Sequence, residues 1–518
     1  MTSATATTLE SPSAVRHTAV RRQIRGSSLL LAGRFLAKGV NFAAQVLIVR
    51  HLSQSDYGAL AYALSIVVLG QDVAAFGLHR AVSRFLPIYQ EKRQYDKLFG
   101  TMIMVTGIVL SIGLLMAVVL YACQGPIARA WIGDPRVLSL LLVLIFLAPV
   151  EAFDKLLLGM FAVFASPRSI FFRKHVLGPG LKLLVVVLLI LGEGSVYFLA
   201  VGYLAAAALG VAIYTVVLFR LLKRQGLFRH FHLPSITMPW REVLTFTIPL
   251  LTSELVYVVM HTMDVIVLQY YAGVGEVAVL RAVQPLALMN QVVMASFAML
   301  FTPLAARMFA RNDRRGINQL YWQTAIWIAV FSFPIFAVTF SIAGPVTVMF
   351  YGARYEQSAA ILSLLSLGCF FNAALGFNGL TLKVYGKLKY VVAINVAAAV
   401  LNLIAILLLV PRYGALGAAI GTCGALIAHN VLKHAGLRLG TGIRLFQRRT
   451  MKVYASIAVA AVALWALQAV AAPPVFVSLA LAAVVSLLVL RMNRRLLRAD
   501  EIFPELLRLP LAKQLLGR

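Results

Sequence analysis

Charged and polar side chains occur inside apolar stretches of this sequence that are long enough to cross a membrane. The first such stretch carries four of them, spaced so that they share one helical face: Arg34, Lys38, Asn41 and Gln45. At a rise of about 1.5 Å per residue, Lys38 lies near mid-membrane, too deep for its ammonium group to reach the surface easily. Because an uncompensated charge is costly there, this face predicts a water-lined cavity with a positive wall or, alternatively, an internal ion pair without a transport role.

A second stripe of ionisable residues has helical spacing further along the chain: Glu254, His261 and Asp264. Histidine titrates near neutral pH, and a desolvated carboxyl group can do the same. Together with Asp72 in another apolar stretch, these residues are candidates for coupling transport to a proton or sodium gradient. A histidine with a purely structural role is the alternative interpretation of His261.

Two further cations lie within apolar stretches. Lys182 directly follows the segment Gly178-Pro179-Gly180, which we expect to be a static kink or a flexing point. Arg281 is placed to pair with Asp264, either as a clamp between helices or as part of a ligand site. Arg and Lys bind phosphate and carboxylate oxygens, so a cavity with a fixed positive wall predicts an anionic cargo.

Other charged residues cluster near the end of the fourth apolar stretch: Glu151, Asp154 and Lys155. They predict a local charge cluster at the lipid interface, with a gate as the alternative.

No catalytic motif occurs in the chain. It contains no GxSxG, HExxH, P-loop or paired CxxC sequence, and its three cysteines, Cys123, Cys369 and Cys423, are widely spaced. The glycine-rich run 414–424 opens an apolar stretch, which favours close helix packing over a dinucleotide loop. We therefore expect no catalytic residues, no metal site and no cofactor, and a protein that is not an enzyme.

The elements that position these residues follow from composition. Hydrophobic residues make up 61% of the 518 residues and charged residues 13%, and the mean hydropathy is +0.88. A soluble protein could not hide so much apolar surface, whereas a bilayer can. The net charge of +29 would suggest a nucleic-acid partner in a soluble protein, but in a membrane protein it is typical of basic cytoplasmic loops. The sequence thus predicts a multi-pass membrane protein with membrane lipids around it and no nucleic acid.

Apolar stretches of about 20 residues predict about 14 transmembrane helices. They fall at residues 28–49, 57–77, 98–121, 137–159, 171–191, 196–219, 243–268, 277–301, 319–341, 357–382, 390–410, 414–432, 452–471 and 474–491. Lys and Arg concentrate in alternate connecting segments, which places both termini in the cytoplasm of a bacterial inner membrane.

The chain also matches itself weakly at an offset of about 220 residues, which places Asp56-Tyr57-Gly58 on Glu276-Val277-Ala278. We expect an all-α polytopic membrane protein with two six-helix bundles, related by a pseudo-two-fold axis along the membrane normal, plus two C-terminal helices. The predicted parts are a basic cytoplasmic tail (1–26), the N-terminal bundle (27–220), a cytoplasmic linker (221–241), the C-terminal bundle (242–436), two extra transmembrane helices (450–491) and a basic amphipathic cytoplasmic tail (492–518).

Three segments carry a resemblance to a known family. They are Arg25-Gly26-Ser27-Ser28, the run from His51-Leu52-Ser53 through Asp56-Tyr57-Gly58 to Phe76-Gly77-Leu78, and Pro411-Arg412-Tyr413-Gly414-Ala415-Leu416-Gly417-Ala418. In their order and spacing they resemble the O-antigen-type polysaccharide and oligosaccharide flippases of the multidrug/oligosaccharidyl-lipid/polysaccharide exporter superfamily. The likeness extends over essentially the whole chain.

The resemblance implies alternating access around a central cavity and an undecaprenyl-pyrophosphate-linked, anionic glycan as cargo. By the same resemblance, Arg34 and Lys38 would contact the lipid phosphates, and residues 452–491 would form a groove for the lipid tail. A polysaccharide polymerase or glycosyltransferases would be partners. The alternatives are a cation-coupled exporter of drugs or metabolites and a membrane-embedded enzyme of glycan assembly.

Overall fold

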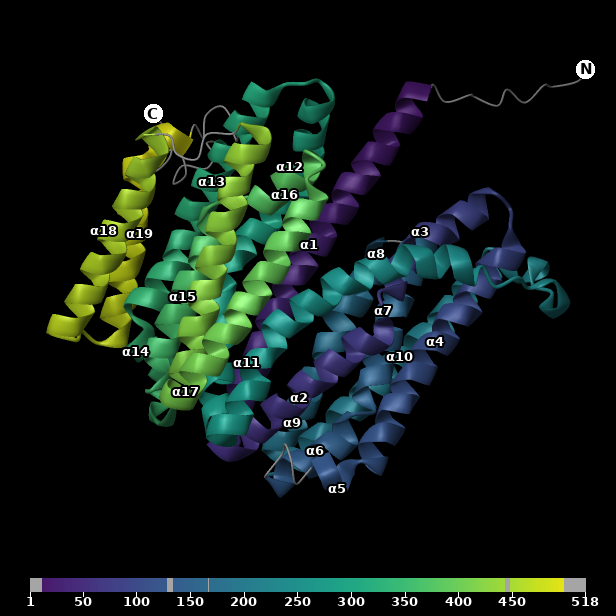
Figure 1. Ribbon diagram of the computed structural model, residues 1–518, viewed down its shortest axis with the longest axis horizontal. Helices are drawn as coiled ribbons and strands as arrows, with labels where there is room; N and C mark the ends of the chain where they lie inside the picture. Colours follow the sequence, from purple (N-terminus) through teal and green to yellow (C-terminus); the bar gives the residue numbers. More distant parts are fainter. Residues whose placement is uncertain (1–11, 128–133, 166, 443–447, 498–518) are drawn as a thin grey trace, which may run out of the picture. The chain divides into compact units, whose positions relative to one another are not determined.

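The computed structural model describes residues 12–127, 134–165, 167–442 and 448–497. These residues form helices with short connections and contain no strand (Figure 1). The helices of the first part are α1 (Pro12–His51), α2 (Gln54–Ala75), α3 (Leu78–Glu91), α4 (Tyr95–Ala122), α5 (Gln124–Ile127), α6 (Pro135–Leu144), α7 (Leu147–Phe164), α8 (Pro167–Phe171), the π-helix η2 (Phe172–Leu177), α9 (Gly178–Leu191), α10 (Val196–Arg224) and the 3₁₀ turns η3 (Leu227–His230) and η4 (Leu233–Ser235).

The second part continues in the same way. Its helices are α11 (Trp240–Leu288), the 3₁₀ turn η5 (Met289–Gln291), α12 (Val292–Ala310), α13 (Arg314–Phe336), the π-helix η6 (Ala337–Ser341), α14 (Ala343–Tyr351), the 3₁₀ turn η7 (Ala353–Tyr355), α15 (Ser358–Ala374), α16 (Asn378–Val384), α17 (Leu388–Thr441), α18 (Arg448–Ala471) and α19 (Val475–Leu497). The expectation of an all-α polytopic membrane protein is confirmed.

Among the described residues, 11 helical stretches are long and apolar enough to cross a membrane. Two long helices, α11 and α17, each hold residues of more than one predicted span. Each is divided into two arms by a glycine with a positive φ angle, Gly273 (φ 83) in α11 and Gly414 (φ 55) in α17. Positive φ angles of this kind favour glycine, which has no Cβ to collide with its own backbone. The predicted spans lie almost wholly on helical residues, the first one on α1, and several of them run over more than one helix.

Glycines draw the two arms of α17 together. A Cβ at Gly417 would overlap the carbonyl group of Leu409, and one at Gly421 would meet Ile406 at 3.2 Å. Leu409 and Gly417 are eight residues apart, so a straight helix would separate them by about 12 Å. The chain therefore folds back at Gly414, and the glycine-rich run serves helix packing as expected.

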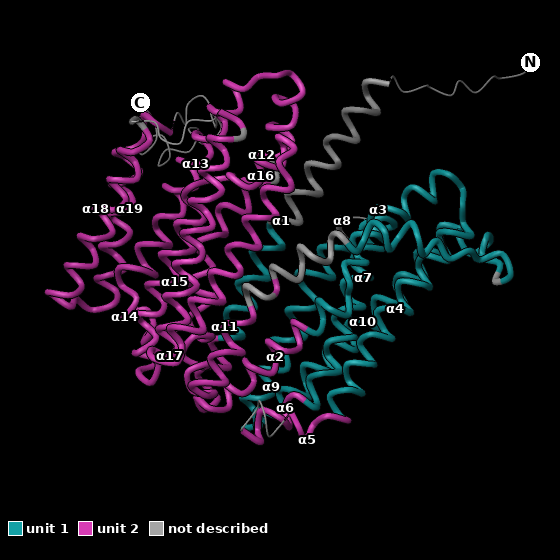
Figure 2. Tube along the Cα trace, in the orientation of Figure 1, with its two compact units in different colours: residues 1–45, 70–121, 142–251 teal, residues 46–69, 122–141, 252–518 magenta. Residues whose placement is uncertain are grey.

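The chain divides into two compact units, shown in Figure 2. Unit 1 comprises residues 1–45, 70–121 and 142–251, and unit 2 comprises residues 46–69, 122–141 and 252–518. Each unit is discontinuous in sequence, since segments of the first 141 residues pack with the C-terminal part. The domain boundaries proposed from the sequence stay a prediction.

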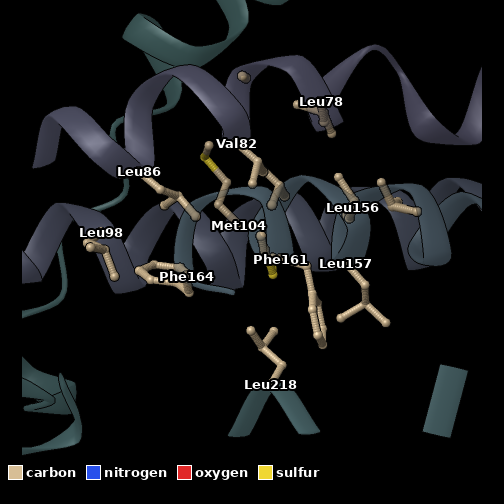
Figure 3. Close-up of a cluster of buried hydrophobic side chains, with 14 of the residues drawn as sticks. Leu78, Val82, Leu86, Leu98, Met104, Leu156, Leu157, Phe161, Phe164 and Leu218 are labelled. Atoms are coloured by element: carbon tan, nitrogen blue, oxygen red, sulfur yellow. The ribbon is translucent and has the colours of Figure 1, made fainter. Parts of the chain in front are cut away.

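Unit 1 is built around a core of apolar side chains from α3, α4, α7 and α10 (Figure 3). Leu78, Val82 and Leu86 occupy one face of α3 and meet Phe161 and neighbouring residues of α7. The helices approach closely because a Cβ at Gly159 would lie 2.9 Å from the carbonyl oxygen of His79. The left-handed residue Gly77 (φ 67) starts α3 as a separate helix. This packing fixes α7, which carries most of the ion pairs described below.

Unit 2 has a corresponding core on α12, α13, α16 and α17. Its largest buried side chains include Phe301, Tyr321, Trp322 and Phe377. The last two helices, α18 and α19, pack on this unit: the Oγ of Ser341 donates a hydrogen bond to the carbonyl oxygen of Ala461 at 2.9 Å.

Candidate functional site

The polar face of α1 begins the candidate site. Arg34, Lys38 and Asn41 are exposed, and Gln45 is half-buried. Among the residues that the structure describes, the carboxylates form their ion pairs with other cations and none with Arg34 or Lys38. Charged groups at this depth need water or a polar ligand beside them. The positive wall and the internal ion pair both stay predictions for this face.

The π-helical turn η2 carries another cation of the candidate site, Arg173. Pro179 cannot donate a backbone hydrogen bond, and its ring would collide with the carbonyl group four residues earlier in a regular α-helix. The chain widens instead into η2, where the amide of Gly178 donates to the carbonyl oxygen of Arg173. Single π-turns of this kind often occur at functional sites. The turn buries the Arg173 side chain to 3% exposure.

Three ion pairs tie α7 to its neighbours within unit 1. Lys155 pairs with Asp72 of α2, and Arg173 of η2 pairs with Asp154. Lys182 of α9 donates to Oε1 of Glu151 at 3.0 Å. Glu151, Asp154 and Lys155 are thus each bonded to a different element, and their place at the lipid interface stays a prediction. Lys182 and Asp72 stay candidates for the cargo path and for ion coupling, and both have a partner in this structure.

Two of these pairs, Arg173 with Asp154 and Lys182 with Glu151, line a cavity of ≈ 340 Å³ in unit 1. Cations outnumber carboxylates among its lining residues, which are Asn41, Val150, Glu151, Asp154, Leu158, Arg173, Lys174, Gly178, Pro179, Lys182, Ala206, Ala207, Gly210, Val211 and Tyr214. Two predicted site residues, Asn41 and Lys182, thus meet at one cavity. Close packing brings α1 to this place, because a Cβ at Gly33 would lie 2.6 Å from the rings of His175 and Phe171.

The sequence singles out neither Arg173 nor Tyr214, which also line this cavity. Both fall within predicted spans, Arg173 in 171–191 and Tyr214 in 196–219. The usable signal was the position of Arg173 six residues before Pro179, where a helix is forced to deform.

The predicted pair in unit 2 is present. Nη2 of Arg281 lies 4.0 Å from Oδ1 of Asp264 and 3.1 Å from the Oγ of Ser65, while Nη1 donates to Gln284. Asp264 is 3% exposed and also accepts from the amide of Val265. Arg281 thus joins the two arms of α11 to α2, which fits a clamp between helices. The side chains of Glu254 and His261 lie outside the described residues.

A second cavity in unit 2 is almost entirely apolar. It measures ≈ 700 Å³ and lies among α13, η6, α15, α17 and α18. Its lining includes Phe336, Phe340, Phe370, Phe371 and Tyr454. A cavity of this composition suits hydrocarbon, and α18 supplies one wall. A groove for a lipid tail at residues 452–491 stays a prediction.

Comparisons with known proteins agree with this architecture. The family model described as "Polysaccharide biosynthesis protein" matches residues 24–309, and the MatE model matches residues 249–408. The succinoglycan biosynthesis transport protein ExoT of Rhizobium meliloti is 24% identical over 67% of this chain and 66% of its own length. An uncharacterized membrane protein of Methanocaldococcus jannaschii, MJ1068, is 22% identical over 77% of this chain and 81% of its own.

Solved structures share the fold. The lipid II flippase MurJ in an inward closed conformation superposes with a TM-score of 0.70 at 16% identity, covering 91% of this chain and 100% of that one. An inward-facing multidrug resistance MATE transporter of the MOP superfamily gives a TM-score of 0.62 at 16% identity, over 77% of this chain and 93% of that one. At these identities the likeness establishes the fold alone.

Proposed function

Because this chain belongs to the polysaccharide biosynthesis protein family, among the polysaccharide flippases of the multidrug/oligosaccharidyl-lipid/polysaccharide exporter superfamily, we propose that it flips an undecaprenyl-pyrophosphate-linked oligosaccharide across the bacterial inner membrane. The oligosaccharide would be the precursor of a surface polysaccharide. Transport would proceed by alternating access, without covalent chemistry, and with both termini in the cytoplasm.

One observation carries the proposal: Arg34 and Lys38 are exposed on α1, which we expect to cross the membrane, and Asn41 of the same face lines the charged cavity of unit 1. Cations in a cavity screened from bulk water attract phosphate oxygens strongly. A pyrophosphate linked to a lipid is an anion that must cross the membrane beside such a face.

The apolar cavity of unit 2 supports the lipid part of the cargo. Its lining of aromatic and aliphatic side chains offers a place for hydrocarbon to stay out of water while the head group moves. The relative ExoT, named as a succinoglycan biosynthesis transport protein, supports a glycan cargo. A polysaccharide polymerase or glycosyltransferases would then act next to this protein.

Energy would come from a proton or sodium gradient or from the membrane potential. Asp72, Glu254, His261 and Asp264 are our candidates for the coupling step. Asp264 is the most deeply buried described member of this set.

The test is a deletion strain complemented with Lys38→Ala, with Lys389→Ala as the matched control because Lys389 is exposed on the other unit. The lipid-linked glycans are isolated, and the leaflet on which they accumulate is determined. We expect precursors trapped on the cytoplasmic face in the deletion and in Lys38→Ala, with normal export in Lys389→Ala. Normal export by Lys38→Ala at normal protein abundance would contradict the proposed role of this face.

A cation-coupled drug exporter is the second candidate, favoured by the MatE match and the MATE-like fold. A cavity for cationic drugs should favour carboxylates and aromatic rings, whereas this face of α1 is positive. Tolerance to cationic dyes on overexpression, with normal polysaccharide in the deletion strain, would select this second function.

A further inference from the structure

We propose that the charged cavity of unit 1 binds one phosphate group, held by Arg173, Tyr214 and Lys182. The inference extends the proposed function and rests on it for one of its two sources, the pyrophosphate of a lipid carrier. The other source is free inorganic phosphate, which needs no assumption about the cargo.

The side chain of Arg173 gives the main evidence that this cavity takes a ligand with a hydrogen-bond acceptor. Its Nη2 atom donates to the carboxylate and to the carbonyl oxygen of Asp154, the latter at 3.0 Å. Its Nη1 atom is buried and has no hydrogen-bond partner in the part of the chain that the structure describes. A buried guanidinium donor without an acceptor is strongly unfavourable, so the site calls for a ligand with an oxygen at this place.

Tyr214 presents a second donor at the same cavity. The Arg173 guanidinium lies 4.4 Å from the centre of the Tyr214 ring and 5.1 Å from that of Phe161, so two aromatic rings hold its plane. The Tyr214 hydroxyl is also buried and unpartnered among the described residues. An acceptor group in the cavity would satisfy both donors.

The charges around the cavity select an anion over a cation. Arg173, Lys174 and Lys182 line it, against Glu151 and Asp154. Both carboxylates are already bonded, Asp154 to Arg173 and Glu151 to Lys182. An incoming metal ion would meet one excess positive charge and two hydrogen-bond donors, whereas a phosphate would be stabilised by all of them.

The size of the cavity also fits. At ≈ 340 Å³ it has room for more than a water molecule, whose share of liquid volume is about 30 Å³. A phosphate group offers several acceptor oxygens, so it can reach the free guanidinium nitrogen and the hydroxyl at the same time.

The experiment measures binding of inorganic phosphate and pyrophosphate to the purified full-length protein in phosphatidylcholine nanodiscs by isothermal titration. Tyr214→Phe removes only the hydroxyl, and Arg173→Lys keeps the charge but loses the forked donor. Tyr197→Phe on the same helix α10 is the matched control, because Tyr197 is exposed and does not line the cavity. Thermal unfolding of each variant verifies that it is folded.

We expect Tyr214→Phe to weaken binding about fivefold to tenfold, as for one lost hydrogen bond, and Arg173→Lys to weaken it more. Tyr197→Phe should bind as the unchanged protein does. Binding that is unaffected by Tyr214→Phe and Arg173→Lys, or the absence of saturable phosphate and pyrophosphate binding in the unchanged protein, would overturn the proposal and leave water as the occupant.

Nanodiscs that contain undecaprenyl phosphate distinguish the two sources. Competition between this lipid and inorganic phosphate supports a site for the lipid carrier, and phosphate binding without competition supports a site for the free anion. The proposed function is tested separately by export in the deletion strain. Export could fail to depend on this protein while phosphate binding still depends on Arg173, so failure of one idea is distinguishable from failure of the other.

Discussion

Arg50, near the end of α1, binds the end of α14, and Arg354, which follows α14, binds the end of α1. Arg50 donates to the carbonyl oxygens of Phe350 at 2.8 Å and Met349 at 2.5 Å, and Arg354 donates to those of Arg50 at 2.9 Å and of Val49. The last carbonyl groups of a helix have no partner within it and carry partial negative charge. Both arginines thus cap α1 and α14 reciprocally within unit 2.

This exchange predicts that the two arginines are energetically coupled. Arg50→Gln and Arg354→Gln should each destabilise the protein by about 1.5–3 kcal/mol, as for hydrogen bonds to a charged group. In the double variant the loss should be smaller than the sum, because each change already loosens the helix end that the other residue binds. Thermal unfolding of the purified single and double variants measures this. Arg412→Gln, an exposed arginine on α17, is the control; strictly additive losses would contradict the coupling.

We expect alanine substitutions at Gly414 and Gly424, two glycines of α17, to differ sharply in their effect on stability. The φ of +55 at Gly414 is unfavourable for alanine, and an added Cβ would lie 2.7 Å from Oε2 of Glu276, which accepts from the amide of Ala415 at 2.8 Å. Gly414→Ala should therefore cost at least about 1–2 kcal/mol of stability. Gly424→Ala, where nothing lies within 4 Å, should be neutral or slightly stabilising. Equal unfolding midpoints for the two variants would show that the turn tolerates a side chain.

The fold could be predicted from the sequence because a bilayer imposes a simple length rule on apolar helices. The break within α17 was also predicted, because the spans 390–410 and 414–432 are separate in the sequence. The connecting segment 78–97 was less readable: it contains the helix α3, whose apolar face packs in the core of unit 1. Hydropathy cannot distinguish such an amphipathic helix from a loop, because its mean over a window is low.

Only some residues of the candidate site could be predicted from the sequence. Lys182 and Asn41 could be singled out because polar residues in apolar spans are conspicuous, and both line one cavity. Their neighbours could not: the pairing of Lys182 with Glu151 depends on how α7 and α9 pack, and the burial of Arg173 depends on a π-turn. Such pairings follow from tertiary packing, which one sequence does not specify. The roles of Glu254 and His261 stay predictions.

Gly58 lies where α2 packs against α11, at the two segments that the weak internal match of the sequence aligns. We expect this contact to need a residue without a side chain. A Cβ on Gly58 would overlap the carbonyl oxygen of Val274, and the side-chain amide of Gln54 donates to the carbonyl oxygen of Gly275 at 3.3 Å. Gly58→Ala must push α2 from α11 and should cost about 1–3 kcal/mol. Gly107→Ala in α4, with open space around its Cβ, is the control. Wild-type stability and export in Gly58→Ala would mean that this contact can yield freely.

The pair of Lys182 and Glu151 offers a test of whether Lys182 positions helices or contacts cargo. Both side chains are partly exposed, so breaking the pair should lower stability by only about 0–1 kcal/mol. If Lys182 contacts an anionic cargo, Lys182→Glu should lower export about tenfold or more, equivalent to about 1.4 kcal/mol.

The charge-exchanged variant, Lys182→Glu with Glu151→Lys, decides between the two roles. It should regain stability because the ion pair is restored in reverse, while export stays low if the cation must lie on α9 to meet the cargo. Export and thermal unfolding are measured on the same membranes, with Lys223→Glu at the exposed end of α10 as the control for a simple change of charge. Recovery of export together with stability would assign Lys182 to holding α9 on α7, and the cargo path would then rest on α1.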